Sequence, residues 1–442
     1  MNRNSTLIGL FCLLSILQSN TSSAINYVDN GSSTNYALNT GDSLHIASGT
    51  YTGTITSFST GAKISVAFAA IFQPAAISFP NVRGTIYVYG TFRMSADFRT
   101  NTGFRIYNYG VVSINGNTIM SGSTQLWMNS YGALMNLNGD ISLTNDNSIV
   151  NQGTINFGAN LTMTGTTSII NKLNINVAGN YQNNGAVLTN QGKFYVNGAI
   201  NFNSGLVYNH CRMIAESGIY NTSGQLFNYG FLWSKSSPGT GALVNSGTIT
   251  NGPGSVILAI SLNNTGTING GGYMHFTGVT TTTNSGTTGA AGITADTIRM
   301  FDASRSNVLT IYDNQTGTVY PNVKFQAFSG LDSNKAYFGG CSMEMVSQIP
   351  LAVNWNHFFV TLNDKTPSLD WSAKADEGTR FEIQRSYDGK NFQTIDLVIA
   401  NNATGYKYND LNVNTKSAIV YYRILAVETT GTQKFSETRT VR

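Results

Sequence analysis

The sequence repeats one polar turn, Asn-x-Gly, about every twenty residues. The stretch NQGTINF at 151–157 returns as NSGTITN at 245–251 and as NTGTING at 264–270. A fixed period of this length is typical of solenoids, in which each structural unit stacks on the next. The repeat therefore predicts a stack of similar coils. The asparagines of the series are Asn108, Asn129, Asn151, Asn171, Asn190, Asn209, Asn228, Asn245, Asn264 and Asn284.

Apolar residues alternate with polar ones on both sides of each turn, which is the pattern of a strand with one buried face. One coil cannot bury its own apolar face, but stacked coils can. We therefore expect residues 81–300 to form a parallel, right-handed β-helix of about ten coils, each adding about 4.8 Å along the axis. The residues expected inside after each turn are Phe92, Val112, Leu134, Ile155, Ile175, Phe194, Met213, Leu232, Ile249 and Ile268.

The recurring asparagine has a structural role in such a stack. At the same turn of every coil, its side-chain amide can donate to one neighbouring coil and accept from the other, which predicts a single Asn ladder. The glycine beside it permits a sharp corner, so Leu173 and Cys211, which stand where glycine is expected, must avoid a glycine-only geometry or be strained. The alternative interpretation of the series is an Asn-rich edge that binds a ligand.

The composition agrees with an all-β chain. Charged residues make up 10% of the sequence, against about a quarter in ordinary globular proteins. Glycine is abundant at 46 residues and proline scarce at 7, which suits short strands and tight turns rather than helices. A hydrophobic fraction of 41% argues against disorder. The formal net charge is +4 and no run of basic residues occurs, so a nucleic-acid partner is not expected.

The first 24 residues have the features of a secretory signal peptide. Arg3 precedes an apolar run at 7–17, and small residues end at Ala24. The run is too short to span a bilayer, and no other run is longer, so we expect a secreted, extracellular or cell-surface protein without a transmembrane span. A buried N-terminal helix is the alternative. Cys12 would be removed with the signal; we expect Cys211 and Cys341 to be unpaired, although an oxidising compartment would let them pair.

Residues 25–80 are expected to be an N-terminal cap with imperfect coils, and 301–348 a transition that closes the other end. From 349 to 442 the twenty-residue repeat is absent, and the sequence predicts about seven short strands of a β-sandwich. We expect Trp371 in its core and a tyrosine of YYRI, at 421–424, to fix a corner by a hydrogen bond. The expected strands are 351–362, 368–372, 380–385, 392–398, 406–409, 419–427 and 433–441.

The C-terminal stretch LDWSAKADEGTRFEIQRSYDGKNFQTI, followed by YKYNDLN and YYRILAVETTGTQKFSE, resembles the fibronectin-III-like module of secreted Bacteroidetes proteins. The resemblance implies an immunoglobulin-like sandwich at 349–442 that serves as a spacer or adaptor. In that family a sorting domain for type IX secretion often follows; none follows Arg442 here, which leaves the export route open. The solenoid is similar in architecture to β-helical, adhesin-like surface proteins.

Many β-helices are polysaccharide lyases or hydrolases, and such enzymes use carboxylates that lie close together on one face. Those of 81–300 fall in different coils, and we interpret them as solvated loop residues, with no catalytic residue, metal site or cofactor expected. Three arginines of two early coils could instead form a basic patch for acidic glycans. The carboxylates are Asp97, Asp140, Asp146, Glu216 and Asp296, and the arginines are Arg93, Arg99 and Arg105.

Outward tyrosines give the best indication of a binding surface, since aromatic rings can stack on sugars. Those we expect on one aromatic face are Tyr109, Tyr131, Tyr195 and Tyr229. The sequence therefore predicts an exported, non-catalytic solenoid, adhesin-like or part of a matrix, that binds glycans or surface proteins. A β-helix lyase or hydrolase and a purely structural spacer are the alternatives. The ligand, the anchoring and the oligomeric state stay open.

Overall fold

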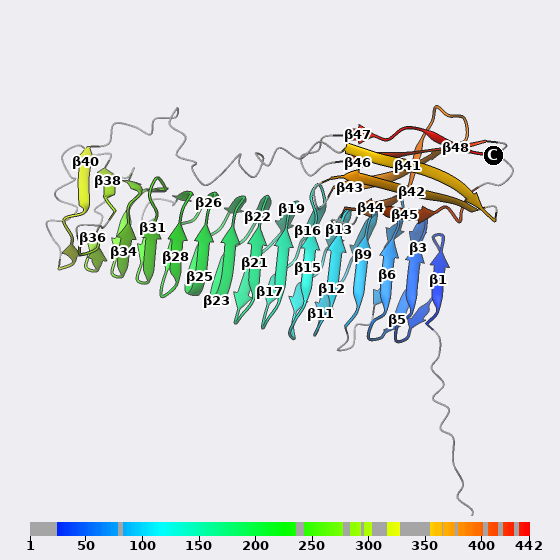
Figure 1. Ribbon diagram of the computed structural model, residues 1–442. Coiled ribbons are helices and arrows are strands. Elements are labelled where there is room, and N and C mark those ends of the chain that lie inside the picture. The colour runs from blue at the N-terminus through cyan, green and yellow to red at the C-terminus, as the bar shows by residue number, and fades with distance from the viewer. Residues whose placement is uncertain are drawn as a thin grey trace, which may run out of the picture.

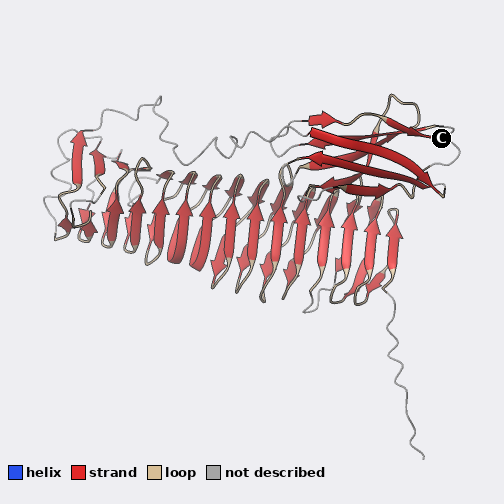
Figure 2. Cartoon of the chain, in the orientation of Figure 1, coloured by secondary structure: helices blue, strands red, loops and turns tan. Residues whose placement is uncertain are grey.

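The described part of the chain consists of strands and turns, without a helix (Figure 2). The computed structural model describes residues 24–77, 83–235, 243–276, 283–292, 296–302, 316–327, 354–364, 366–375, 379–400, 405–413, 419–427 and 433–442. No helix in these ranges could cross a membrane. The strands form a parallel β-solenoid followed by an antiparallel β-sandwich, which confirms the predicted fold class (Figure 1).

Each coil of the solenoid has three sides, which we name a, b and c in chain order. Side b strands are β1 (Asn26–Asp29), β3 (Ser43–Ile46), β6 (Lys63–Val66), β9 (Thr85–Val88), β12 (Arg105–Asn108), β15 (Leu126–Asn129), β18 (Ser148–Asn151), β21 (Ser168–Asn171), the ends of β23 (Tyr181–Asn190) and β25 (Ile200–Asn209), β28 (Gln225–Asn228), β31 (Thr248–Asn251), β34 (Thr267–Gly270), β37 (Thr287–Thr288) and β39 (Thr318–Val319). Side c strands are β4 (Thr50–Tyr51), β7 (Ile71–Phe72), β10 (Thr91–Met94), β13 (Val111–Ile114), β16 (Leu134–Leu137), β19 (Thr154–Phe157), β22 (Asn174–Val177), β24 (Lys193–Val196), β26 (Arg212–Ala215), β29 (Phe231–Ser234), β32 (Val256–Ala259), β35 (Tyr273–Phe276), β38 (Ile298–Asp302) and β40 (Val323–Ala327). Side a strands are β2 (Tyr36–Leu38), β5 (Thr54–Phe58), β8 (Ala76–Ile77), β11 (Phe98–Thr100), β14 (Thr118–Met120), β17 (Ile141–Leu143), β20 (Leu161–Thr164), the beginnings of β23 and β25, β27 (Ile219–Asn221), β30 (Leu243–Asn245), β33 (Leu262–Asn264) and β36 (Thr283–Asn284).

The solenoid extends beyond the predicted bounds at both ends. Its first strand, β1, pairs in parallel with β3 from Asn26 opposite Ser43, so coils already stack within the segment expected to be an N-terminal cap, although the pairing on side a shifts register at Tyr36. At the other end, β38 and β40 continue side c to Ala327. Side c is a sheet of 14 strands, which corresponds to a rod about 60 Å long at the usual strand spacing.

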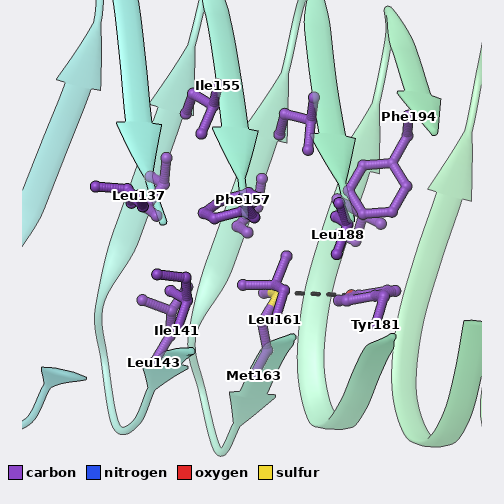
Figure 3. Close-up of a cluster of buried hydrophobic side chains, with 14 of the residues drawn as sticks. Leu137, Ile141, Leu143, Ile155, Phe157, Leu161, Met163, Tyr181, Leu188 and Phe194 are labelled. Atoms are coloured by element: carbon purple, nitrogen blue, oxygen red, sulfur yellow. Dashed lines mark hydrogen bonds between the residues drawn. The ribbon is translucent and has the colours of Figure 1, made fainter. Parts of the chain in front are cut away.

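Alternation along each strand points every second side chain into a continuous core (Figure 3). Ile155 and Phe157 of β19 are buried there, as the sequence predicted. The prediction was wrong for Leu134: the corner after Asn129 holds one extra residue, so Met135 points inward and pairs with Ile155. Ile249 and Ile268 are also buried, but they lie on side b rather than side c.

The predicted Asn ladder exists at the corner between sides b and c. The Nδ2 group of Asn151 donates to Asn171 Oδ1 at 2.8 Å and to the Asn174 carbonyl at 2.8 Å, while its Oδ1 accepts from Asn129 Nδ2 at 2.8 Å. All members are buried. The ladder joins Asn108, Asn129, Asn151, Asn171, Asn190, Asn209, Asn228 and Asn251.

The last three asparagines of the predicted series belong to a second ladder, which corrects the single-ladder prediction. It lies at the corner between sides a and b and joins Asn221, Asn245, Asn264 and Asn284 through bonds of 2.7 Å. The corner changes because the segment after Lys235 adds residues before side a, so one repeat after Asn228 the chain has reached only Asn245 at the end of side a, one side earlier than the corner between sides b and c. The asparagines therefore continue at nearly the same spacing in the sequence, but they occupy a different corner of the coil.

The corner glycines serve close approach between coils rather than an unusual backbone. A Cβ added to Gly153 would lie 2.4 Å from the Ala133 carbonyl oxygen of the preceding coil. Gly132, in the longer corner, is the member of the series with a left-handed φ, of 73°. Leu173 and Cys211 have no positive φ, so neither carries the backbone strain that a glycine-only conformation would impose.

Cys211 is disulfide-bonded, which corrects the expectation of unpaired thiols. The other cysteines of the sequence, Cys12 and Cys341, lie outside the described residues.

The C-terminal sandwich has two antiparallel sheets. One contains β41 (Asn354–Asn363), β42 (Thr366–Lys374) and β45 (Tyr406–Asn409); the other contains β43 (Arg380–Ser386), β44 (Gln393–Ile399), β46 (Val420–Val427), β47 (Gln433–Phe435) and β48 (Arg439–Val441). Trp371 is fully buried between them, as predicted. The tyrosine lock is Tyr422, whose hydroxyl donates to Asp410 Oδ2 at 2.7 Å beside the ion pair of Asp410 with Arg385.

The sandwich lies beside the N-terminal coils instead of extending the rod (Figure 1). A cavity of about 380 Å³ separates the two units, with Ala47 and Phe68 on the solenoid side and Arg385 and Tyr408 on the other. Burial raises the pKa of Asp396 in β44, which the nearby His45 partly opposes, and the charge of Asp396 adds to the burial that raises the pKa of Tyr89.

We expect Asn171→Ala to destabilise the solenoid by about 2–4 kcal/mol, because it removes buried hydrogen bonds to Asn151 in one neighbouring coil and to Asn190 and the Lys193 carbonyl in the other. The measurement is urea denaturation followed by circular dichroism. The control is Asn203→Ala, which removes one exposed Asn–Asn hydrogen bond and should cost less than about 0.5 kcal/mol. Equal effects of the two substitutions would contradict the structural role of the ladder.

Candidate functional site

Charged side chains are nearly absent from the central coils, and those present gather on one side. Between Asn147 and Ala295 the sequence has four Lys or Arg residues and one carboxylate. The four cations lie in four successive coils, on side c or at its corner, and together with the carboxylate they give four minus one, a net charge of +3. With three neighbouring rings they form the cationic patch: Lys172, Lys193, Arg212, Lys235, Glu216, Tyr195, Phe231 and Trp233.

Strand alternation positions the patch. Lys193 and Arg212 are the first residues of β24 and β26, where they pair side by side and are exposed, while the next residues, Phe194 and Met213, are buried. Lys172 is exposed at the preceding corner, two residues before β22. Lys235 follows directly after β29. The cations therefore lie on four successive coils: Lys193 and Arg212 are side by side at the start of side c, Lys172 precedes it and Lys235 follows it.

Aromatic rings lie beside three of the four cations. The Lys235 Nζ atom is 4.1 Å from the centroid of the Trp233 ring, and the Lys193 Nζ atom is 5.5 Å from that of Tyr195. The Arg212 Cζ atom is 5.8 Å from the Phe231 centroid. Contacts of this kind are attractive because the ring face is electronegative. The cations are thus held near apolar surfaces instead of extending freely into water.

Glu216 organises one end of the patch. Its Oε1 atom is 2.6 Å from Lys235 Nζ, and it accepts a hydrogen bond from the Tyr195 hydroxyl. Partial burial and this carboxylate raise the pKa of Tyr195. The patch thus offers one carboxylate that is already bound by its neighbours, together with an excess of positive charge and ring surfaces. This arrangement suits binding of a polar ligand.

The structure does not bring the four predicted tyrosines together on one face. Tyr109 and Tyr229 occupy the same corner but six strands apart, which is about 29 Å at the usual spacing. Tyr131 is half-buried in the longer corner after Asn129, and Tyr195 alone lies on side c. The corner rings also stack on neighbouring coils: Tyr109 on Tyr89 with centroids 5.1 Å apart, and Tyr229 on His210 at 5.2 Å.

This stacking changes what the corner tyrosines can do. Each ring in a pair uses one face on its neighbour, so that face is closed to a sugar ring. Tyr109 is also desolvated, which raises its pKa to about 12. Of the four predicted residues, Tyr195 is the one that lies in the cationic patch.

The arginine patch considered as an alternative is not formed. Arg93 lies on side c in β10, Arg99 on side a in β11 and Arg105 on side b in β12, so the three side chains leave the coil in three directions. Arg99 also pairs with Asp97 at 3.6 Å. Proximity in sequence does not bring these side chains together, because six residues are enough to turn a corner of the coil.

Two of the candidate carboxylates belong to a third, exposed ladder between sides c and a. Asp97 Oδ1 accepts the backbone N–H of Asn117 at 2.9 Å, and Asp140 Oδ1 accepts that of Asn160 at 3.1 Å. Asn117 performs the same role between them, accepting the Asp140 N–H at 3.0 Å. The two carboxylates are two coils apart, about 10 Å, at the upper limit for an inverting glycosidase pair.

The other carboxylates lie elsewhere. Asp146 accepts a hydrogen bond from the Thr166 hydroxyl at the corner between sides a and b, and Asp296 lies before β38. Among the described residues, no group of three His, Cys, Asp or Glu side chains could hold a metal ion. Comparisons of the chain with protein-family models, with curated proteins and with solved structures found no match.

The cationic patch was missed because its residues are 19 to 23 positions apart in sequence. The signal that could have found it is the charge distribution. A window of about 150 residues with four cations and one carboxylate, spaced by the repeat length, implies one charge per coil on a common side.

We expect Asp140→Asn to leave stability unchanged within about 0.5 kcal/mol, because asparagine already performs the same role at positions 117 and 160. Asp140→Ala, which leaves the Asn160 N–H without its acceptor, should cost about 1 kcal/mol. Urea denaturation of both variants measures the difference. A large loss in the asparagine variant would show that the charge itself matters.

Burial depresses the pKa of His275 to about 4, against 6.5 in a model peptide. The unfolded chain therefore takes up this proton before the folded chain does, and stability should fall as the pH decreases from about 6.5 towards 4. His275 stacks on Phe301 with centroids 4.5 Å apart, so His275→Phe can keep the packing. The thermal midpoint of the variant should depend less on pH across this range; identical profiles would refute the assignment.

Proposed function

We propose that the protein is an exported, non-catalytic binding scaffold, adhesin-like or part of an extracellular matrix, that holds glycans on the outside of its solenoid. The cationic patch is the observation that carries this proposal. Recognition of a sugar uses ring surfaces for its apolar faces and polar groups for its hydroxyls, and ligand sites usually combine both. Trp233, Tyr195, Lys235 and Glu216 supply these elements within three coils.

Two independent features support export. The N-terminal 24 residues have the composition of a secretory signal. The disulfide at Cys211 also favours an oxidising compartment, because disulfides are rare in the cytosol.

The sandwich supports the resemblance to secreted Bacteroidetes proteins. Its two antiparallel sheets, the buried Trp371 and the Asp388-Gly389 turn all occur within the stretch that resembles the fibronectin-III-like module. We therefore propose a surface protein of this type. The sandwich lies beside the N-terminal coils, so the rod does not hold it at a distance, which favours a binding scaffold over a spacer.

The competing function is a polysaccharide-active enzyme, and the spacing of Asp97 and Asp140 is the observation in its favour. Both carboxylates act as acceptors for backbone N–H groups in a ladder that asparagine continues, which explains their presence without catalysis. They also lie on an exposed corner rather than in a cleft with substrate-binding groups around them.

The test is a glycan array probed with residues 25–442, with release of reducing sugar ends followed on every glycan that binds. We expect binding without release. Release that disappears in an Asp97→Asn, Asp140→Asn variant would establish the enzyme instead. Absence of both binding and release would refute the scaffold proposal and leave the spacer.

A further inference from the structure

We propose that side b of the solenoid binds side b of a second copy of the protein, with the two rods antiparallel. This inference goes beyond the proposed glycan binding, which uses the cationic patch, and does not depend on it. Its basis is one row of outward side chains that contains no charge. The row, which we name the side b stripe, consists of Tyr107, Met128, Val150, Ile170, Thr189 and Tyr208.

The parallel register of the coils aligns the stripe. Each member lies directly opposite the next one on the neighbouring strand, beginning with Tyr107 opposite Met128. The residues before and after each member point inward, since side chains of a strand alternate between its two faces. Ile169, for example, is buried, whereas Ile170 is 36% exposed. Successive coils therefore present one outward side chain each in a single row.

Two further rings extend the stripe at its ends. Tyr87 stacks on Tyr107 with ring centroids 5.3 Å apart, and Phe227 stacks on Tyr208 at 5.0 Å. Both rings occupy the same outward position of their strands, β9 and β28. The stripe and these two rings together extend over the neighbouring side b strands from β9 to β28.

The other two sides of the same coils are polar. On side c, the outward residues of β16, β19 and β22 are joined by side-chain hydrogen bonds of 2.9 Å; they are Asn136, Asn156 and Asn176. On side a, the corresponding residues are Ser142, Thr162 and Gln182. An apolar row is therefore confined to one side of the repeat. A contiguous apolar surface of this kind marks an interaction site in a soluble protein.

The charge of this face favours a second copy in the antiparallel arrangement. Among the outward residues of side b from β9 to β28, all of which the structure describes, Arg105 is the one charged residue. It is the first residue of β12, at the margin of the face. Antiparallel rods place the two copies of this arginine at opposite ends of the contact, whereas parallel rods would bring them together, where like charges repel.

The stripe is also nearly symmetric about its centre, which a two-fold contact of one face with itself requires. A tyrosine lies at each end, and Val150 and Ile170 lie in the middle. With a two-fold axis between β18 and β21, Tyr107 of one copy faces Tyr208 of the second copy, and Val150 faces Ile170. Rings then meet rings and aliphatic side chains meet aliphatic ones, in two sheets packed about 10 Å apart.

The face is large enough for a weak dimer. Eight strands of four residues, at the usual spacings of about 4.8 Å and about 3.3 Å, give a rectangle of about 38 Å by about 13 Å. The area is about 500 Å² on each copy and about 1,000 Å² for the pair, which is the lower limit for a specific interface.

The sandwich leaves this face open. In Figure 1 the strands of side b point upward at the front, and the sandwich lies above them, at the corner where the first of these strands end. Antiparallel rods also place the two sandwiches at opposite ends of the dimer, so they do not collide.

Sedimentation velocity of residues 25–442 over a range of concentrations tests the dimer. We expect a monomer–dimer equilibrium with a Kd on the order of 10 µM, as suits an interface of this size. Ile170→Lys should raise the Kd at least about a hundredfold, because the dimer would bury an unpaired charge. The matched control is Thr162→Lys, on side a of the same coil, which should change the Kd by less than about twofold.

A pair of charge variants tests the antiparallel arrangement. Tyr107→Lys and Tyr208→Glu should each be monomeric alone, and an equimolar mixture should dimerise, because the introduced lysine of one copy faces the introduced glutamate of the other. In parallel rods these two groups would be about 24 Å apart and could not pair. Circular dichroism checks that every variant is folded.

Each contrary result has a distinct meaning. A wild-type protein that stays monomeric at every concentration would overturn the inference, as would equal effects of Ile170→Lys and Thr162→Lys. Folded, monomeric charge variants that do not associate when mixed would overturn the antiparallel arrangement. Adsorption of a monomeric protein to microcrystalline cellulose, abolished by Ile170→Lys, would assign side b to a flat carbohydrate surface instead. The glycan array tests the cationic patch separately, so either proposal can fail without the other.

Discussion

The solenoid depends on hydrogen bonds that run from coil to coil. A chain with 10% charged residues and short strands has few other means of fixing one coil on the next. Parallel pairing satisfies the strands, but each corner leaves amide and carbonyl groups that sheet pairing does not reach. Buried asparagines bind these groups and each other, with Nδ2 to Oδ1 distances of 2.7–2.8 Å. Stacking then buries one continuous core along the rod (Figure 3).

The same constraint gives the rare charges their importance. The buried ladders consist of neutral asparagines and the core of apolar side chains, so neither requires a charged residue. A charged side chain in the central coils therefore either has another role or is simply solvated. Strict register then places residues separated by one repeat beside each other, so Lys193 and Arg212 become neighbours on one surface. A repeat architecture therefore makes neighbours on one surface of residues that are one repeat apart in the sequence.

The sequence was sufficient to predict the solenoid, the buried alternation and the Asn corners, because each is a local pattern repeated at a fixed period. It was insufficient to predict the change of ladder after Asn228. The chain is longer between sides c and a after Lys235, so Asn245 follows Asn228 at nearly the repeat distance in sequence but lies at a different corner. The candidate site shows the same limit. Arg93, Arg99 and Arg105 are close in sequence but lie on three sides, whereas Lys193 and Arg212 are a full repeat apart in sequence but pair on one side.

Hydrogen exchange followed by mass spectrometry tests the coil-to-coil account most directly. At the corner after β18, the Gly153 N–H donates to Asn151 Oδ1 at 3.1 Å and the Gln152 N–H donates to the Asn129 carbonyl at 2.7 Å. The account predicts that this corner exchanges as slowly as β18 and β19 on either side of it, although turns are usually the fastest segments to exchange. Rapid exchange at 151–153 beside protected strands would contradict it.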